Sequence, residues 1–340
     1  MTDFKKTVDK LFNSADIQIN GPRSWDPQIN NDLFYARVLS GGSLALGESY
    51  MDGWWDCESL DQFGDKLLSA RIDKQVKITN PYFLMNVVRA YLFNAQTTKR
   101  AYIVGTEHYD IGNHLFSLML DERMNYSCGY WRRAENLEQA QINKLDLICR
   151  KLHLKPGMSV LEIGCGWGSF AKYAAENYGV SVHGVTISKE QVSYAKKSCD
   201  GLDVSFELKD YRELKKKYDC IVSIGMFEHV GYKNYRNYMK VVNRCLKDDG
   251  LFLLHTIGRN NPGRATDPWI NKYIFPNGMS PSSSQICKSI EGLFVIEDWH
   301  NFGQDYDPTL MAWNEKFQKN FDKLTEVYDE RFKRMWEYYL

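Results

Sequence analysis

The sequence has no long apolar run, no excess of charge of either sign and no paired-cysteine motif. No stretch reaches the roughly 18–20 apolar residues that a transmembrane helix needs, so any membrane contact is expected to be peripheral. Residues 1–6 lack the apolar core of a signal peptide. Because 43 basic residues balance 43 acidic ones, no overall field recruits nucleic acid or an anionic membrane, and only a local patch remains as a route to such partners.

The eight cysteines form no CxxC pair, and the chain has no HExxH motif. This usage is typical of a reducing compartment, so we expect a cytoplasmic protein. The sequence shows neither internal repeats nor low-complexity segments. A length of 340 residues with 44% hydrophobic content predicts a large core, in two domains or one large one.

The most informative run is VLEIGCGWG at residues 160–168, an apolar strand that ends in three alternating glycines. Only glycine lets a backbone turn this sharply and approach a ligand this closely. The spacing differs from the G-x-G-x-x-G dinucleotide fingerprint, and the next strand ends in Thr186 rather than in an acid that would hold a ribose. We therefore favour a seat for S-adenosylmethionine over one for NAD, with a plain strand-to-helix turn as the alternative.

Apolar or β-branched runs alternate with helical segments between residues 157 and 257. The predicted strands are 160–163, 182–187, 204–208, 220–224 and 251–256. This order predicts an α/β fold, with a parallel sheet that carries helices on both faces. Residues 1 to about 115 show helical periodicity without regular strands, so we expect a smaller, mostly helical N-terminal domain.

Three aromatic or apolar segments suggest contact with an apolar substrate. The Gly/Pro/Asn/Ser-rich insertion at 259–284 contains an aromatic stretch, 267–276, that we expect to form a lid or substrate wall. Trp54 and Trp55 line an apolar tunnel or, more ordinarily, belong to the core. Residues 81–93 are apolar with a single charge and suit burial, which we favour, or a lipid surface.

Titratable residues follow the fourth and fifth predicted strands. Glu228 and His255 are expected to face the cofactor crevice, because ligands of open α/β sheets bind outside the carboxyl ends of the strands. With Cys128 and Tyr306 they would bind an anion or move a proton. Each has a structural alternative as a buried thiol, a hydrogen-bonded histidine, a helix-terminal charge or a packed aromatic. A zinc site or a Cys–His nucleophile ranks lower, because neither explains the glycine loop.

Together these motifs resemble the cyclopropane-fatty-acid-phospholipid synthases, S-adenosylmethionine-dependent enzymes related to the mycolic acid cyclopropane synthases. The resemblance spans nearly the whole chain and rests on HYDIGN at 108–113, YSCGYW at 126–131, LEIGCGWG at 161–168, GVTIS at 184–188, DYR at 210–212, FEHVG at 227–231, YIFP at 273–276 and DYD at 305–307. It implies a Rossmann-like class I methyltransferase sheet in a catalytic domain at 116–340. It also implies a lipid-engaging N-terminal domain at 1–115.

The resemblance further implies the site residues and the reaction. Cofactor residues would be Tyr126, Ser127, Gly164, Gly166, Thr186, Ile187 and Gln191, with Asp210 and Tyr211 near the adenine. Cys128, Glu228, His255, the Ile257 backbone amide and Tyr306 would hold bicarbonate, and no metal is implied. The methyl group of S-adenosylmethionine would be transferred to a cis double bond of a phospholipid acyl chain, and bicarbonate would remove a proton as the cyclopropane ring closes.

The partners implied are unsaturated phospholipid at the inner face of the cytoplasmic membrane and a second copy in a homodimer, without nucleic acid. Alternative functions are methyl-branched lipid formation, methylation of a small-molecule amine, or non-catalytic lipid binding by a truncated chain. The resembling proteins continue beyond the segment that matches residues 331–340, with the rest of a helix and a final strand. A chain that ends at Leu340 is therefore expected to lack the last antiparallel strand and to leave sheet edges unpaired.

Overall fold

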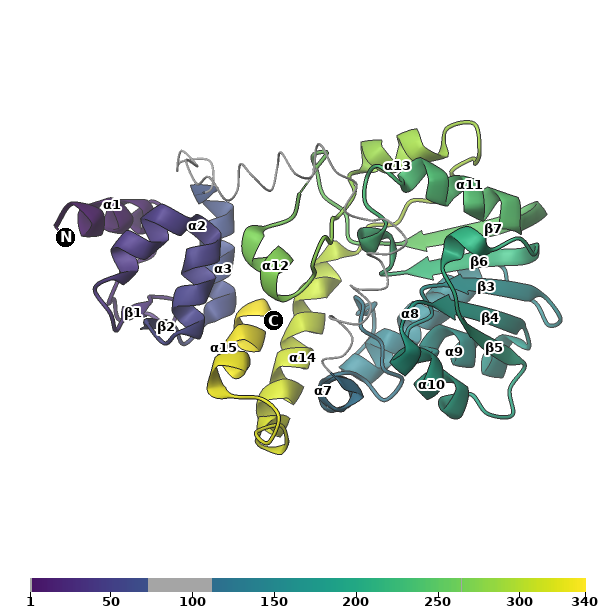
Figure 1. The fold of residues 1–340 in the computed structure, drawn as a ribbon, viewed down its shortest axis with the longest axis horizontal. Coiled ribbons are helices and arrows are strands. Elements are labelled where there is room, and N and C mark those ends of the chain that lie inside the picture. The colour runs from purple at the N-terminus through teal and green to yellow at the C-terminus, as the bar shows by residue number, and fades with distance from the viewer. Residues whose placement is uncertain (1, 73–111, 264) are drawn as a thin grey trace. The chain divides into compact units, whose positions relative to one another are not determined.

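The computed structural model describes residues 2–72, 112–263 and 265–340 (Figure 1). These residues form two compact units. The N-terminal unit contains 2–72, 267–276 and 323–340, and the sheet unit contains the other described residues. Segments 267–276 and 323–340 fall within the predicted catalytic domain at 116–340, whereas their contacts group them with the N-terminal unit. The apolar stretch at 81–93 lies outside the described residues, so its burial stays a prediction.

The sheet unit is built on five parallel strands in the order β5-β4-β3-β6-β7. These strands are β3 (Ser159–Ile163), β4 (Ser181–Thr186), β5 (Val204–Leu208), β6 (Tyr218–Ile224) and β7 (Leu246–His255). The chain runs outward from β3 to β5 and then returns to place β6 on the other side of β3. Ligands of such sheets bind outside the strand ends at this reversal. The predicted α/β class is confirmed.

Helices cover both faces of this sheet (Figure 1). Residues of α8, α9 and α10 pack with Val160 and Val182 on one face, and those of α11 and α13 pack with Leu161 and Ile221 on the other. Neighbouring residues of a strand point to opposite faces, which explains why both faces need an apolar cover. The described helices of the sheet unit are α7 (Gly112–Met119), α8 (Leu137–Lys151), α9 (Ser169–Tyr178), α10 (Lys189–Ser198), α11 (Tyr235–Cys245), α13 (Ser283–Ile290) and α14 (Tyr306–Asn320). The 3-10 turns of this unit are η1 (Tyr211–Glu213), η2 (Phe227–His229) and η3 (Gly303–Asp305).

Strand β7 begins five residues earlier than the predicted strand at 251–256. Leu246 pairs with Tyr218, and the register shifts before Cys220 pairs with Leu251. Asp249 has a φ of 64°, so the polar run between these pairs forms a bulge rather than the turn that its composition suggests. Among the described residues the sheet has no antiparallel strand.

The N-terminal unit contains three helices and one short antiparallel strand pair before residue 73: α1 (Thr2–Asn13), β1 (Gln28–Ile29), α2 (Phe34–Met51), β2 (Trp55–Asp56) and α3 (Leu60–Ser69). The predicted mostly helical character is confirmed for the described part. Trp55 is 0% exposed, and its ring lies 5.0 Å from those of both Tyr50 and Phe63. Trp55 is therefore a core residue rather than part of a tunnel.

Helix α12 (Pro268–Tyr273) joins this unit from the insertion at 259–284. The Trp269 ring is buried and its Nε1 donates to Met51 Sδ at 3.3 Å. The Tyr273 hydroxyl donates to Glu48 Oε1 at 2.8 Å. The aromatic stretch at 267–276 thus packs on α2, and its role as a lid or substrate wall stays a prediction.

Helix α15 (Glu330–Tyr339) also packs on α2. The Tyr338 ring lies 5.7 Å from that of Tyr50, and Arg334 Nη2 donates to the Trp55 carbonyl at 2.7 Å. A further 3-10 turn, η4 (Phe321–Lys323), precedes it in the chain. No helix in the described ranges is long and apolar enough to cross a membrane.

Replacing Trp55 by alanine is expected to lower the free energy of unfolding by about 3–5 kcal/mol, because a large buried ring leaves a cavity. Urea denaturation followed by circular dichroism measures the loss. Trp54→Ala is the control, since the Trp54 ring is only partly buried and stacks with Arg37 at 4.5 Å, and should cost about 1 kcal/mol. Equal losses in the two variants would contradict the assigned core.

Candidate active site

A cavity of about 160 Å³ lies at the carboxyl ends of β3, β4, β5 and β6. All nine residues that were predicted to hold the cofactor line it: Tyr126, Ser127, Gly164, Gly166, Thr186, Ile187, Gln191, Asp210 and Tyr211. They come from the ends of β3, β4 and β5, from α10 and from the segment before α8, so the sheet topology brings them together. The position is the one expected for a ligand of an open α/β sheet.

The glycine loop at the end of β3 has a backbone that other residues rarely adopt. The φ angles of Gly164, Gly166 and Gly168 are 83°, 52° and 86°. A Cβ on Gly164 would lie 2.7 Å from the Cβ and Cγ atoms of Met226, whereas a Cβ on Gly166 would meet no atom within 4 Å. The loop therefore needs glycine for its turn, and at Gly166 it presents bare backbone to the cavity.

A hydrogen-bond network fixes the end of β4. Thr186 Oγ1 donates to Gln191 Oε1 at 2.8 Å and accepts from the Ser188 amide at 3.3 Å. Ser188 caps α10 by accepting from the Gln191 amide at 3.3 Å. These contacts hold the Gln191 side chain against the strand end, where it lines the cavity.

The segment after β5 forms the opposite wall. Asp210 is 2% exposed, and its Oδ2 accepts from Arg212 Nη1 at 2.9 Å. Its Oδ1 accepts from the Arg212 amide at 2.9 Å. The Tyr211 hydroxyl is buried and has no hydrogen-bond partner in the part of the chain that the structure describes. A ligand in the cavity would find this hydroxyl available.

Lys144 in α8 contacts two residues that line the cavity, and the sequence analysis did not predict it. It is 1% exposed, and its Nζ donates to Ser127 Oγ at 2.8 Å and to Asn125 Oδ1 at 3.1 Å. Burial lowers the pKa of Lys144 to about 8, and the nearby Asp121 opposes this. Since Ser127 and Asn125 both line the cavity, Lys144 orients two of its polar side chains.

Glu162 contributes a carboxyl group from within β3. It is 3% exposed, lines the cavity, and burial raises its pKa well above the ordinary value. Its Oε2 has no hydrogen-bond partner among the described residues. A buried acceptor of this kind suits a positively charged ligand group.

The pKa of Lys144 leads to a prediction about stability. Between pH 8 and 10.5 the unfolded chain holds the Lys144 proton more tightly than the folded chain, because burial lowers the folded pKa from 10.5 to about 8. Stability contributed by Lys144 therefore rises with pH in this window. Relative to a Lys144→Met variant, the wild type should gain about 2 kcal/mol between pH 8 and about pH 9.5.

Urea denaturation of both proteins at the two pH values measures this difference. Lys155→Met, at an exposed lysine, is the control and should show no pH-dependent difference from the wild type. A stability difference between Lys144→Met and wild type that stays constant across the window would contradict the lowered pKa of Lys144.

The predicted anion site begins with Glu228 in η2. Glu228 is 8% exposed, and burial raises its pKa. Its Oε1 accepts from the Ile257 amide at 2.6 Å, while Oε2 has no hydrogen-bond partner in the described part of the chain. The Ile257 amide, predicted to hold the anion, thus donates to Glu228 in this structure.

His255 ends β7 beside this pair. Its ring stacks on Phe302 at 5.3 Å with an interplanar angle of 16°, and its Nδ1 has no partner among the described residues. Burial, with the charge of Lys144 adding to it, lowers the pKa of His255 to about 3. The imidazole is therefore neutral near pH 7 and can donate or accept one hydrogen bond at Nδ1.

Tyr306 begins α14, and Cys128 lies in the segment before α8. The Cys128 side chain is 4% exposed, and burial raises its pKa to about 12. Its neighbour Gly129 donates its amide to Thr309 Oγ1 at 3.1 Å, one turn after Tyr306. A neutral thiol and a neutral imidazole do not form the ion pair that a Cys–His nucleophile needs.

The five predicted anion-site residues lie beside the cavity and not in its wall. Glu228 sits between Met226 and His229, which do line the cavity, and Cys128 follows Ser127. Glu228 and Ile257 are in direct contact. Within residues 2–72, 112–263 and 265–340, no group of three or more His, Cys, Asp or Glu is placed to hold a metal ion.

Comparisons with known proteins give the same picture. Residues 96–340 match the family model for mycolic acid cyclopropane synthetase. The chain is 56% identical over 338 residues to the cyclopropane-fatty-acyl-phospholipid synthase of Escherichia coli K12, covering 98% of this chain and 87% of that protein.

Two solved structures share its fold. The cyclopropane synthase MmaA2 from Mycobacterium tuberculosis has a TM-score of 0.66 and 31% identity, over 70% of this chain and 90% of that one. The mycolic acid cyclopropane synthase CmaA1, complexed with SAH and CTAB, has a TM-score of 0.65 and 32% identity, over 70% and 90%. The chain therefore belongs to the mycolic acid cyclopropane synthetase family and is an S-adenosylmethionine-dependent methyltransferase.

Proposed function

We propose that this enzyme transfers a methylene carbon from S-adenosylmethionine to the cis double bond of unsaturated phospholipid acyl chains and so forms a cyclopropane ring. The observation that carries the proposal is the buried Glu228 carboxyl, with one unshared oxygen, beside a cavity lined by all nine predicted cofactor residues. The name of the Escherichia coli relative supports phospholipid as the substrate.

The cavity residues fit an adenosyl cofactor. Glu162 offers an unshared buried oxygen to the ammonium group, and the open backbone at Gly166 leaves room for close approach. Thr186 and Gln191 would hold polar groups at the end of β4, and Asp210 would do so at the adenine end. When bound, the cofactor supplies a methyl group on a positively charged sulfur.

The residues beside the cavity fit a small oxyanion. Glu228 Oε2 and His255 Nδ1 are buried polar atoms without partners in the described part of the chain. Bicarbonate carries both an O–H donor and acceptor oxygens, so it matches a carboxylate on one side and an imidazole on the other. When bound, it supplies a base for the proton that leaves the transferred methyl as the ring closes.

The protein's own residues hold this arrangement in place. The Ile257 amide binds Glu228 Oε1 and so fixes the orientation of that carboxyl group. Phe302 holds the His255 ring by stacking. Burial of Cys128 and Glu228 would keep water from the reacting carbon. Holding the sulfonium methyl in line with the double bond contributes about 7–11 kcal/mol.

A second product has support from one comparison. The chain is 31% identical, over 91% of its length, to the tuberculostearic acid methyltransferase UfaA1 of Mycobacterium tuberculosis. A relative of that kind would methylate the same double bond and leave a methyl branch. We favour the ring because Glu228 and His255 present unshared polar atoms where a base would bind.

Product analysis tests the proposal. The full chain is incubated with S-adenosylmethionine and vesicles of cis-monounsaturated phospholipid, and the released acyl chains are analysed by gas chromatography and mass spectrometry. Ring-containing chains are expected, with none from saturated vesicles. Methyl-branched chains would show that the enzyme forms the second product and not the ring. Unmodified chains with intact cofactor binding would overturn the proposal in favour of lipid binding alone.

We further propose that the enzyme works as a homodimer at the membrane surface, with the N-terminal unit engaging lipid. Support comes from the phospholipid synthase relative, which matches this chain across 98% of its length. Light scattering of the purified protein tests the dimer, and vesicle flotation of the wild type tests the membrane contact.

A further inference from the structure

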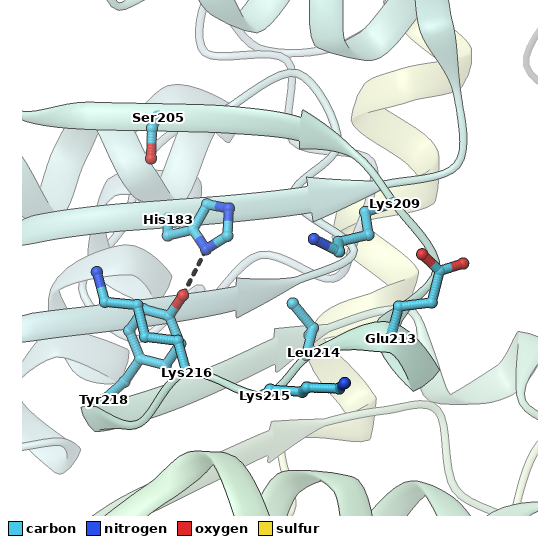
Figure 2. Close-up of a pocket in the computed structure, with 8 residues that line it drawn as sticks. All are labelled: His183, Ser205, Lys209, Glu213, Leu214, Lys215, Lys216 and Tyr218. Atoms are coloured by element: carbon cyan, nitrogen blue, oxygen red, sulfur yellow. Dashed lines mark hydrogen bonds between the residues drawn. The ribbon is translucent and has the colours of Figure 1, made fainter.

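A second hollow, of about 430 Å³, lies on the sheet unit outside the site described above. Figure 2 shows the side chains that line it, which project from three strands and from the segment that follows β5. The lining residues are His183, Ser205, Lys209, Glu213, Leu214, Lys215, Lys216 and Tyr218. Its size falls within the range of small-molecule sites, roughly 300–1,000 Å³.

Its charge is dominated by lysine. Three lysines and one carboxylate, Glu213, line the hollow, and the nearby Glu207 carboxylate also lies 3.4 Å from His183 Nε2. Lys209 pairs with Glu207 at 2.9 Å, whereas Lys215 and Lys216 are exposed and form no ion pair with any residue that the structure describes. In Figure 2 the Lys215 and Lys216 side chains point to opposite sides of their segment, so a bound anion would give a counter-charge to ammonium groups on both sides.

The floor of the hollow supplies neutral hydrogen-bonding groups. His183 Nδ1 and the Tyr218 hydroxyl are 2.5 Å apart, and their rings stack at 5.9 Å with an interplanar angle of 29°. The Ser205 hydroxyl lies on the strand beside His183, since the two residues are paired. Burial lowers the pKa of His183, so the ring is neutral at pH 7 and does not compete for the lysines' counter-ion.

We propose that this hollow is a second binding site, specific for a phosphate-bearing anion. Ammonium groups and hydroxyls are the donors that phosphate oxygens take, and the stacked rings and Leu214 offer an apolar surface to the rest of the molecule. The source of the phosphate is a free metabolite or a lipid headgroup. The proposal goes beyond the proposed function and does not depend on it.

The location places such a site on the segment that also lines the cofactor cavity. Lys209 lines both hollows, and the residues that follow it divide between them: Asp210, Tyr211 and Arg212 line the cofactor cavity, and Glu213 to Lys216 line the second hollow. One short segment thus forms a wall of each.

Calorimetry and vesicle flotation test the proposal with the full chain at about 0.15 M salt. Pyrophosphate titration probes the free anion, and vesicles of phosphatidylglycerol or phosphatidylcholine probe the headgroup. We expect saturable binding in at least one arm and a loss of tenfold or more when Lys215 and Lys216 are both replaced by alanine. Binding in the pyrophosphate arm alone indicates a metabolite, and phosphatidylglycerol-dependent flotation that the double variant loses indicates a lipid.

The matched control replaces Lys196 and Lys197 in α10 by alanine. Both lysines are exposed, and their replacement removes the same charge. It should bind like the wild type. Equal losses in both double variants would show charge attraction without a site and overturn the proposal, as would the absence of binding by the wild type in both arms. Circular dichroism confirms that each variant is folded.

Discussion

A Glu228→Gln enzyme is expected to lose at least about 100-fold of its turnover on cis-unsaturated phospholipid, because it would hold the bicarbonate base poorly and a general base contributes at least that much. Cofactor affinity should stay unchanged, because Glu228 does not line the cofactor cavity. An amide has nearly the shape of the carboxyl, so packing is preserved. It loses the negative charge and places an N–H₂ group where one of two acceptor oxygens stood.

Two other carboxyl groups make this experiment specific. Glu162→Gln alters a cavity-lining carboxyl and should weaken S-adenosylmethionine binding more than it slows the bound complex. Glu326→Gln removes an exposed charge and should leave both quantities at the wild-type values. Turnover and calorimetric affinity are measured for all three. Unchanged turnover in Glu228→Gln would remove Glu228 from the mechanism.

A Gly164→Ala enzyme is expected to bind S-adenosylmethionine at least about 30-fold more weakly, equivalent to about 2 kcal/mol. Two effects add at this position. A φ of 83° is unfavourable for any residue with a Cβ, and the new Cβ would lie 2.7 Å from Met226 atoms. Because Gly164 and Met226 both line the cavity, relief of the contact must change its wall.

The Gly201→Ala variant separates these effects. Gly201 has a φ of 80°, and a Cβ there would meet nothing within 4 Å. It should lose about 1 kcal/mol of stability from backbone strain alone and keep its cofactor affinity. Calorimetry and urea denaturation measure both quantities. Equal cofactor affinity in the two variants would refute the assigned role of the Gly164 contact.

The cofactor cavity was predictable from sequence because local patterns determine strand ends. Alternating glycines mark where β3 stops, and parallel topology brings all strand ends to one edge. The pattern marks Thr186 as the end of a predicted strand, but its role at the cofactor, like that of Asp210, came from the family resemblance. Tyr126 and Ser127 also came from the family resemblance, because no periodicity in the sequence indicates that they lie at the carboxyl ends of the strands.

Lys144 escaped prediction for a physical reason. A lysine in an amphipathic helix is ordinarily solvated, and nothing local shows that Asn125 and Ser127 from an earlier loop meet it. Glu162 was more visible, because a charge inside an apolar strand is itself unusual. The bulge in β7 was hidden because Asp249, at a φ of 64°, lies in a run that also suits a turn.

The packing of α15 on α2 has a consequence for the order in which the molecule is made. Arg334 and Trp55 are 279 positions apart, so a ribosome adding ~5–20 residues per second needs roughly 15–60 s to supply the second partner after the first. During that interval the surface of Tyr50 and Trp55 that Tyr338 covers is open to other apolar surfaces. The N-terminal unit is the first to be synthesised and among the last to be completed.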